Sequence, residues 1–224
     1  MTPQELKNSI LQLAIQGKLV EQRPEEGTAA ELLEKIARHG TAGTHGTTKT
    51  PGTTRTKSRA AHRASSVSSV LSVPSVSSVP FVPSVPDDEK PFDIPESWEW
   101  VRLGEVCEIL DSKRRPITKS ERTSGPYPYY GASCVQDYVA EYIFDEPLVL
   151  LGEDGAKWGK GDNSAFQISG KTWVNNHAHV LRPLFDINHA YLVHALCILD
   201  LRVFVTGTTV PKLNQARMCQ NLKA

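Results

Sequence analysis

The chain has 224 residues, a hydrophobic content of 39% and no net charge at neutral pH. This length and hydrophobic share suit one or two ordinary globular domains, and no stretch approaches the roughly 20 consecutive apolar residues that a membrane span requires. The first residues lack a basic region followed by an apolar one, which excludes a secretory signal. We therefore expect a cytoplasmic protein.

The charges are distributed unevenly along the chain. Residues 1–40 carry a net charge of −1, residues 41–90 carry +3 and residues 91–224 carry −2. A domain that binds nucleic acid by itself usually has a basic face. The net negative charge of residues 91–224 therefore counts against tight, independent DNA binding. It is compatible with a subunit that contacts bases while its partners neutralise phosphates.

Two short helices are predicted in residues 1–40, which form a helical spacer segment. The first begins with a capping box at Thr2–Glu5 and stops at Gly17, and the second begins with a capping box at Thr28–Glu31 and ends at Gly40. Alone they bury too little apolar surface to form a domain. Their apolar stripes should pack on another helix or subunit, or on the domain that follows. In the first helix the stripe consists of Leu6, Ile10 and Leu13.

Residues 41–90 form a low-complexity segment that we predict to be a disordered linker. It begins rich in Thr, Gly, Lys and Arg and continues as Ser-Val-Pro repeats. Frequent proline prevents helix and breaks ladder pairing, and the polar remainder cannot bury enough surface to offset ordering entropy. Its cations could touch DNA phosphates or simply be solvated. They are Lys49, Arg55, Lys57, Arg59 and Arg63.

The remainder is predicted to be an α+β domain over residues 91–214, with a mixed β-sheet and short helices. Turn-forming residues separate short apolar runs of strand type, and one later run has helical spacing. Residues 215–224 should start a further helix, which the end of the chain truncates. The expected strands are 147–151, 165–169 and 172–181, the last two joined by a turn; the expected helix is 187–201, and 206–214 is extended.

The cysteines and histidines do not form a recognisable metal or disulfide framework. The four cysteines are widely separated and none belongs to a CxxC pair, so free thiols are expected. His177 and His179 would share one face of a strand, which in principle suits a metal. No third ligand lies at a recognisable spacing, so structural roles are favoured for both.

The sequence contains no recognisable catalytic motif. Residues 155–161 superficially look like a phosphate loop, but the motif's first glycine would fall at Asp154, and no Ser or Thr follows Lys160. Residues 87–90 contain acidic and lysine residues typical of metal-dependent nucleases, but they are contiguous in the linker rather than on neighbouring strands. Neither an amino-methyltransferase motif nor a Ser/His/Asp order is recognisable. We expect no catalytic, cofactor-binding or metal-binding residues on this chain.

Several short motifs nevertheless occur in a characteristic order. Residues 94–105 read Ile-Pro-Glu-Ser-Trp-Glu-Trp-Val-Arg-Leu-Gly-Glu and residues 150–155 read Leu-Leu-Gly-Glu-Asp-Gly. Residues 173–183 contain Asn-Asn-His-Ala-His, and residues 207–214 read Gly-Thr-Thr-Val-Pro-Lys-Leu-Asn. Together with the helical pattern of residues 4–38, this resembles the target recognition domain of the specificity subunits of type I restriction-modification systems.

The resemblance implies sequence-specific binding of double-stranded DNA without catalysis. In that family a full specificity subunit has two recognition domains, which read a bipartite target. A DNA adenine methyltransferase subunit and a restriction/translocase subunit do the chemistry, and S-adenosylmethionine, ATP and Mg bind there. With one recognition domain, this chain is expected to be a half-subunit that needs a second specificity half, or a truncated form. The alternative is a remnant that acts at most as a protein-interaction module without DNA activity.

Candidate residues follow from the loops and the motifs. Base or backbone contacts are expected from cations and aromatic rings on loops; the DNA-binding candidates are Lys113, Arg114, Arg115, Lys119, Tyr130, Lys157 and Lys160. Structural roles are expected for Gly152, Asp154, Gly155, Asn176, His177, Thr208 and Pro211. In this hypothesis the two glycines permit a tight turn, in which Asp154 bonds to the local backbone. Asn176 and His177 satisfy buried polar groups, and residues 208–214 fix the chain's exit into the next helix. Metal binding by Glu153 and Asp154 is the weaker alternative.

Overall fold

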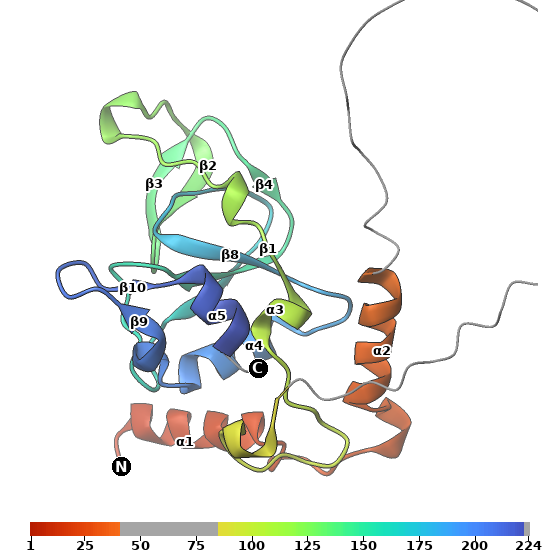
Figure 1. Cartoon of the computed structure of the whole chain (residues 1–224). Coiled ribbons are helices and arrows are strands. Elements are labelled where there is room, and N and C mark those ends of the chain that lie inside the picture. Colours follow the sequence, from red (N-terminus) through yellow and green to blue (C-terminus); the bar gives the residue numbers. More distant parts are fainter. Residues whose placement is uncertain (41–84, 222–224) are drawn as a thin grey trace, which may run out of the picture.

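The computed structural model describes residues 1–40 and 85–221, and it confirms the α+β class. Two four-stranded sheets form the body of the domain (Figure 1). In the view of Figure 1, helix α1 (Pro3–Ile15) lies at one end, and strands β2 (Ser124–Tyr130), β3 (Val135–Val139) and β4 (Phe144–Asp145) lie at the other. None of the helices in these residues has both the length and the apolar composition needed to cross a membrane.

The first sheet has the order β1-β8-β5-β6, and every pairing in it is antiparallel. All five residues of β5 are buried, as expected for a strand at the centre of the core. The main hydrophobic cluster lies against this sheet and includes Val149, Leu151 and Leu181. The strands are β1 (Cys107–Ile109), β5 (Leu148–Gly152), β6 (Ala165–Ile168) and β8 (Ala178–Pro183).

The second sheet has the order β3-β2-β7-β4, where β7 is Lys171–Val174. Strands β2 and β7 pair in parallel, with Tyr129 opposite Trp173, whereas the other pairings are antiparallel. On one face Tyr129, Trp173 and Val139 form a small buried cluster. We call this the outer face, because the segment 114–122 passes over it, as described below.

The structure corrects the expectation of one strand over 172–181. The chain leaves the second sheet after Val174 and enters the first at Ala178. Asn175 makes this break, because its amide donates to the Tyr130 carbonyl and its side-chain oxygen accepts from the His177 amide. Residues 169–171 join the two strands as expected, but they lead from one sheet to the other, since β6 and β7 lie in different sheets. Alternating hydrophobicity does not reveal such a change of sheet.

The N-terminal helices begin as predicted. Thr2 and Glu5 form a reciprocal capping box at the start of α1, and Thr28 and Glu31 do the same before α2 (Ala29–Gly40). Helix α1 packs on α4 (His189–Ile198) through a cluster that includes Leu11, Ile15, Ala195 and Ile198. Its other side stays open: Leu6, Ile10 and Leu13 are 50%, 46% and 43% exposed. Helix α1 therefore docks on its own domain and still presents an apolar stripe.

Contacts around Ser97 join the two described parts of the chain. The Ser97 carbonyl accepts from the Ala29 amide at 2.8 Å, and its hydroxyl donates to the Gln22 side chain at 3.2 Å. The ring of Trp98, beside it, packs edge-on against Tyr191 of α4. These contacts set the position of the helices on the domain, which the sequence left undetermined. The predicted disorder of residues 41–84 lies outside the described residues, whereas residues 85–90, also assigned to the linker, include a 3-10 turn at Asp87–Glu89 and the buried Val85.

The C-terminal residues form the two predicted helices, with additional short elements between them. Helix α4 is followed by a 3-10 turn at Leu201–Phe204, and a small hairpin of β9 (Val205–Thr206) and β10 (Lys212–Leu213) replaces the expected extended stretch. Helix α5 (Gln215–Asn221) begins after Asn214, whose side chain caps the amides of the first turn. Met218 anchors α5 in the main core. A short helix α3 (Leu103–Val106) packs beside α5 and leads into β1.

Candidate nucleic-acid interface

Three of the sequence motifs meet in one network of charged side chains at the ends of β1, β5, β8 and β10. We call this network the polar hub. Its members are separated by up to about a hundred positions in the sequence, yet each has at least one hydrogen bond or ion pair to another member. They are Asp111, Arg114, Glu153, Asp154, His177, His179 and Lys212.

Arg114 is the centre of the hub. Its Nη1 donates to Glu153 Oε2 at 2.6 Å and to the Ala178 carbonyl at 2.7 Å, and its Nη2 lies 3.2 Å from Asp111 Oδ2. The side chain is only 12% exposed. Arg114 was a leading candidate for a base contact, and the structure argues against this, because the interior takes up the guanidinium donors. Its role is to pair with two carboxylates at once, in addition to the contact of Asp111 with His179 and that of Glu153 with Lys212.

His179 completes the inner part of the hub. Its Nδ1 lies 2.6 Å from Asp111 Oδ2, and its Nε2 lies 2.7 Å from the Leu213 carbonyl. The ring is almost fully buried. Its two nitrogen contacts tie β8 to the segment after β1 and to β10.

Asp111, Glu153 and His179 together offer a ligand set of the kind that binds metals, with atoms within 4.8 Å of one another. Sequence spacing did not reveal this grouping, since the two carboxylates lie 68 and 26 positions from the histidine. The Arg114 guanidinium bonds to both carboxylates, however, and places a positive charge where a cation would have to sit. The geometry fits an ion-pair network better than a metal centre.

Asp154 forms the outer part of the hub. It lies 3.0 Å from Lys212 Nζ and also bonds to His177 Nδ1. Burial disfavours the ionised carboxyl, but the hydrogen bonds from Lys212 and His177 outweigh it and lower the pKa of Asp154. The expected bond from Asp154 to its own local backbone is not what the structure has. The turn itself is formed by Gly155, whose φ of +67° favours glycine.

The remaining motif residues divide into buried and exposed groups. Gly152 is buried and its carbonyl accepts from Trp158 Nε1 at 2.9 Å. Asn176 was expected to satisfy buried polar groups, but it is exposed, and the buried amide is its neighbour Asn175. Thr208 and Pro211 are exposed in the β9–β10 loop. The contacts that fix the chain's passage into α5 come from the next two residues. Lys212 joins the hub, and the Leu213 amide donates to the Glu153 carbonyl.

From the hub the chain runs over the outer face of the second sheet as the segment 114–122, which we call the basic segment. Trp173 Nε1 donates to the Arg115 carbonyl at 2.6 Å, and the Ile117 amide donates to the Tyr129 hydroxyl at 3.1 Å. The Arg122 guanidinium lies over the Tyr129 ring, 4.2 Å from its centroid, and pairs with Asp137. Side chains of the sheet therefore hold the backbone of this segment at Arg115 and Ile117, and they hold the side chain of Arg122 at its end.

The anchored backbone leaves cations on the surface. Lys113, Arg115 and Lys119 are all exposed. Residues 111–122 hold five basic and two acidic side chains, although residues 91–224 carry a net charge of −2. Arg114 and Asp111 form an ion pair inside the hub, so the exposed part of this stretch is basic. The arrangement presents positive side chains from a rigid support, which suits contact with an anionic partner.

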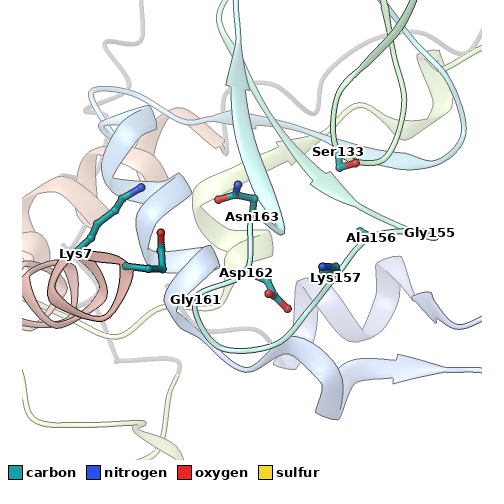
Figure 2. Close-up of a pocket in the computed structure, with 9 residues that line it drawn as sticks. Lys7, Ser133, Gly155, Ala156, Lys157, Gly161, Asp162 and Asn163 are labelled. Carbon is teal, nitrogen blue, oxygen red and sulfur yellow. The ribbon is translucent and has the colours of Figure 1, made fainter. Parts of the chain in front are cut away.

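The other candidates lie elsewhere. The Tyr130 ring packs against Phe166 in the core between the sheets, and burial raises its pKa. Lys157 and Lys160 are exposed on the loop after β5. Lys157 lines a polar cavity of about 490 Å³ between this loop and α1, and Figure 2 shows Lys7 of α1 on the opposite side of it. Lys113, Arg115 and Lys119 are thus exposed on the basic segment or just before it, whereas Lys157 lies beside α1.

Sequence reasoning assigned no role to three residues of the polar hub and the outer face. They are Asp111, Arg122 and Lys171. Asp111 has no local signal, because its partners Arg114, His179 and the Val180 amide come together only through the fold. Alternating tyrosines in β2 were a visible signal for the sheet face that supports the segment.

An exposed basic segment that a charged frame holds over a sheet is an arrangement typical of a binding domain. Comparison with known proteins narrows this class. The chain belongs to the family of type I restriction modification DNA specificity domains, whose family model matches residues 95–222. This confirms the resemblance found in the sequence motifs.

Individual relatives agree with the family. The chain is 38% identical over 123 residues to a putative type I restriction enzyme specificity subunit of Haemophilus influenzae, covering 54% of this chain and 31% of that protein. It is 32% identical over 106 residues to the EcoAI specificity subunit of Escherichia coli, covering 47% of this chain and 13% of that one. The chain thus spans a third or less of these relatives.

Among solved structures, the type I restriction-modification S subunit from M. genitalium aligns with a TM-score of 0.44 and 12% identity. That alignment covers 64% of this chain and 36% of that chain. The HsdS subunit from Thermoanaerobacter tengcongensis aligns with a TM-score of 0.41 and 17% identity, covering 59% and 34%.

Proposed function

We propose that this chain reads one half of a bipartite DNA target for a type I restriction-modification complex. It binds duplex DNA in a sequence-specific manner and performs no chemistry itself. The basic segment approaches the DNA, and Arg115 is the leading residue for a contact with a base edge. Lys113 and Lys119 flank it and contact phosphates, which position the domain without reading sequence.

The observation that carries this proposal is the attachment of Arg115. Its carbonyl is bonded to Trp173, and its neighbour Arg114 is fixed in the hub, yet its own side chain is exposed. Recognition of a base edge needs a donor group held within a narrow range of positions, and a rigid backbone provides this at small entropic cost. An exposed arginine on a mobile loop would lack this property.

The chemistry belongs to partner subunits in this proposal. A DNA adenine methyltransferase subunit binds S-adenosylmethionine, and a restriction/translocase subunit binds ATP and Mg. A second specificity half reads the other part of the target. Support for docking comes from α1, whose apolar stripe of Leu6, Ile10 and Leu13 remains exposed although the helix already packs on α4. Exposed apolar stripes of this kind are typical of helix–helix contacts between subunits.

The test is to purify the tagged full chain from its native cells, identify the proteins that accompany it by mass spectrometry, and select duplexes from a random library with the recovered material. We expect a methyltransferase and an enriched sequence motif. The same selection with Arg115→Ala should lose the preference at one or more positions of that motif. If no methyltransferase is recovered and no sequence is enriched, the chain is a remnant without DNA activity and the proposal is wrong.

A further inference from the structure

We propose that Lys171 contacts a phosphate of the bound duplex, at a site where the rings of Tyr127 and Tyr142 hold its ammonium group. We call these three residues the lysine platform. This inference rests on the proposed function and extends it, because it adds a contact surface on the second sheet beyond the basic segment.

The platform has a defined geometry. Lys171 Nζ lies 4.8 Å from the centroid of the Tyr142 ring and 5.9 Å from that of Tyr127. The two rings meet edge to face with centroids 5.1 Å apart. Lys171 and Tyr142 are exposed, and Tyr127 is half-buried. A lysine side chain normally loses several rotamers when it binds a ligand, and cation–π contacts with two rings reduce that loss before the ligand arrives.

The pairing of the strands places the platform on the outer face. Tyr129 pairs with Trp173 in parallel register, so Tyr127 and Lys171, each two positions earlier, point to the same side of the sheet. Tyr129 and Trp173 are the residues that bond to Ile117 and Arg115 of the basic segment. The platform and the basic segment therefore lie next to each other on one face, and a duplex that covers one reaches the other.

The charge of Lys171 is not neutralised by an ion pair within residues 1–40 and 85–221. Other cations of the domain behave differently: Arg122 pairs with Asp137, and Lys212 pairs with Asp154. Asp145 is the direct cross-strand neighbour of Lys171, but the ammonium group lies over the tyrosine rings instead of forming an ion pair with it. The aromatic contacts leave the full positive charge available to an anion.

A phosphate is the ligand that suits this group. An ammonium is a compact point charge without the planar fork of an arginine, so it favours a phosphate over the edge of a particular base. A contact of this kind strengthens binding to every sequence and increases its dependence on salt.

The experiment compares the full chain with its Lys171→Gln variant in binding a 24-bp duplex of arbitrary sequence at 50 and 200 mM salt. Removing one phosphate contact lowers the slope of log affinity against log salt by about 0.9, so the affinity lost between the two salt concentrations shrinks about threefold. Asp145→Asn should act in the opposite direction and tighten binding, which general damage to the fold cannot produce. Lys18→Gln, a variant of an exposed lysine just after α1, is the matched control and should leave the slope unchanged.

The outcomes are distinguishable. If the wild-type chain binds DNA with the same salt slope as Lys171→Gln, the platform contacts no phosphate and this inference is overturned, while the proposed function stands. If the wild-type chain shows no salt-dependent binding even together with the proteins that accompany it from its native cells, both are overturned. Thermal unfolding identifies a variant that fails to fold. If Lys171→Gln fails to fold, Lys171→Arg, which keeps the charge, should retain the salt slope. Asp145→Asn then tests the inference, because it should tighten binding.

Discussion

Arg114 and Arg115 are adjacent in the sequence and have opposite roles in the fold. Arg114 turns inward, is 12% exposed and bonds to Glu153 and Asp111, whereas Arg115 turns outward into solvent. The Arg115 amide donates to the Val174 carbonyl, and the Arg115 carbonyl accepts from Trp173, so the backbone is fixed on both sides of Arg115. The inward arginine stabilises the frame, and the outward one is free to bind.

Replacing Arg114 with Met should therefore lower stability more than replacing Arg115. Arg114→Met removes the guanidinium that bonds to both Asp111 and Glu153 in a largely buried network, at a cost of about 3 kcal/mol. Arg115→Met alters an exposed side chain and should change the free energy of unfolding by less than about 0.5 kcal/mol. Urea unfolding of both variants measures the difference. Equal stabilities would show that the hub does not depend on Arg114.

For DNA binding, we expect the substitution of Arg115 to have a larger effect than that of Arg114. Arg115→Ala should weaken binding to the selected duplex by roughly 1–3 kcal/mol and relax the preference at one base pair, as expected for loss of an arginine contact with guanine. Competition binding against duplexes that each differ at one position measures this. A loss that is uniform across all sequences would instead make Arg115 a phosphate contact, and an unchanged affinity would remove it from the interface.

Lys212→Met should change the dependence of stability on pH. The pKa of Asp154 is lowered in the folded protein, so its ion pair stabilises the fold above the ordinary carboxyl pKa, and this stability is lost as the pH falls through the lowered value. Lys212 is 45% exposed, so solvent screens the pair and the loss at pH 7 should be only about 0.5 kcal/mol. Unfolding measured from pH 6 to pH 2.5 should show the difference between variant and wild type shrinking below about pH 4. A difference that stays constant with pH would mean that another interaction of Lys212 matters.

The cysteines should react with alkylating reagents in a fixed order. Burial, with a smaller contribution from the Cys219 thiol, raises the pKa of Cys107 to about 12, and burial also raises the pKa of Cys197 and Cys219. Cys134 is exposed. Iodoacetamide at neutral pH should label Cys134 first and Cys107 only on unfolding, because the thiolate is the reactive form. Mass spectrometry of the peptides gives the order; early labelling of Cys107 would contradict its burial against α5.

Local chemistry made the helix starts predictable, and long-range contacts made the site difficult to predict. Both capping boxes involve residues three positions apart, so the sequence alone contains the whole interaction. The buried strand β5 was predictable from its continuous apolar run. The break at Asn175 was not, since it depends on a bond to Tyr130, which lies 45 positions away.

The same reason explains why the inward orientation of Arg114 was not predicted. Two adjacent arginines on a loop look equivalent in a sequence, and only the positions of Glu153 and Ala178 decide which one turns inward. The motifs identified the strands whose ends form the hub, but their residues gave no sign that they bond to one another. Lys171 was missed because its aromatic partners lie on two other segments of the chain, before β3 and after it.

The tie at Ser97 has a consequence for changes in the length of the linker. Ser97 bonds to Gln22 and Ala29 without using any residue of the Ser-Val-Pro repeats. For a linker of the kind that the sequence predicts here, each doubling of length adds only about 0.6 kcal/mol to the cost of closing the loop. Lengthening or shortening the repeats should therefore leave the helices in their position on the domain.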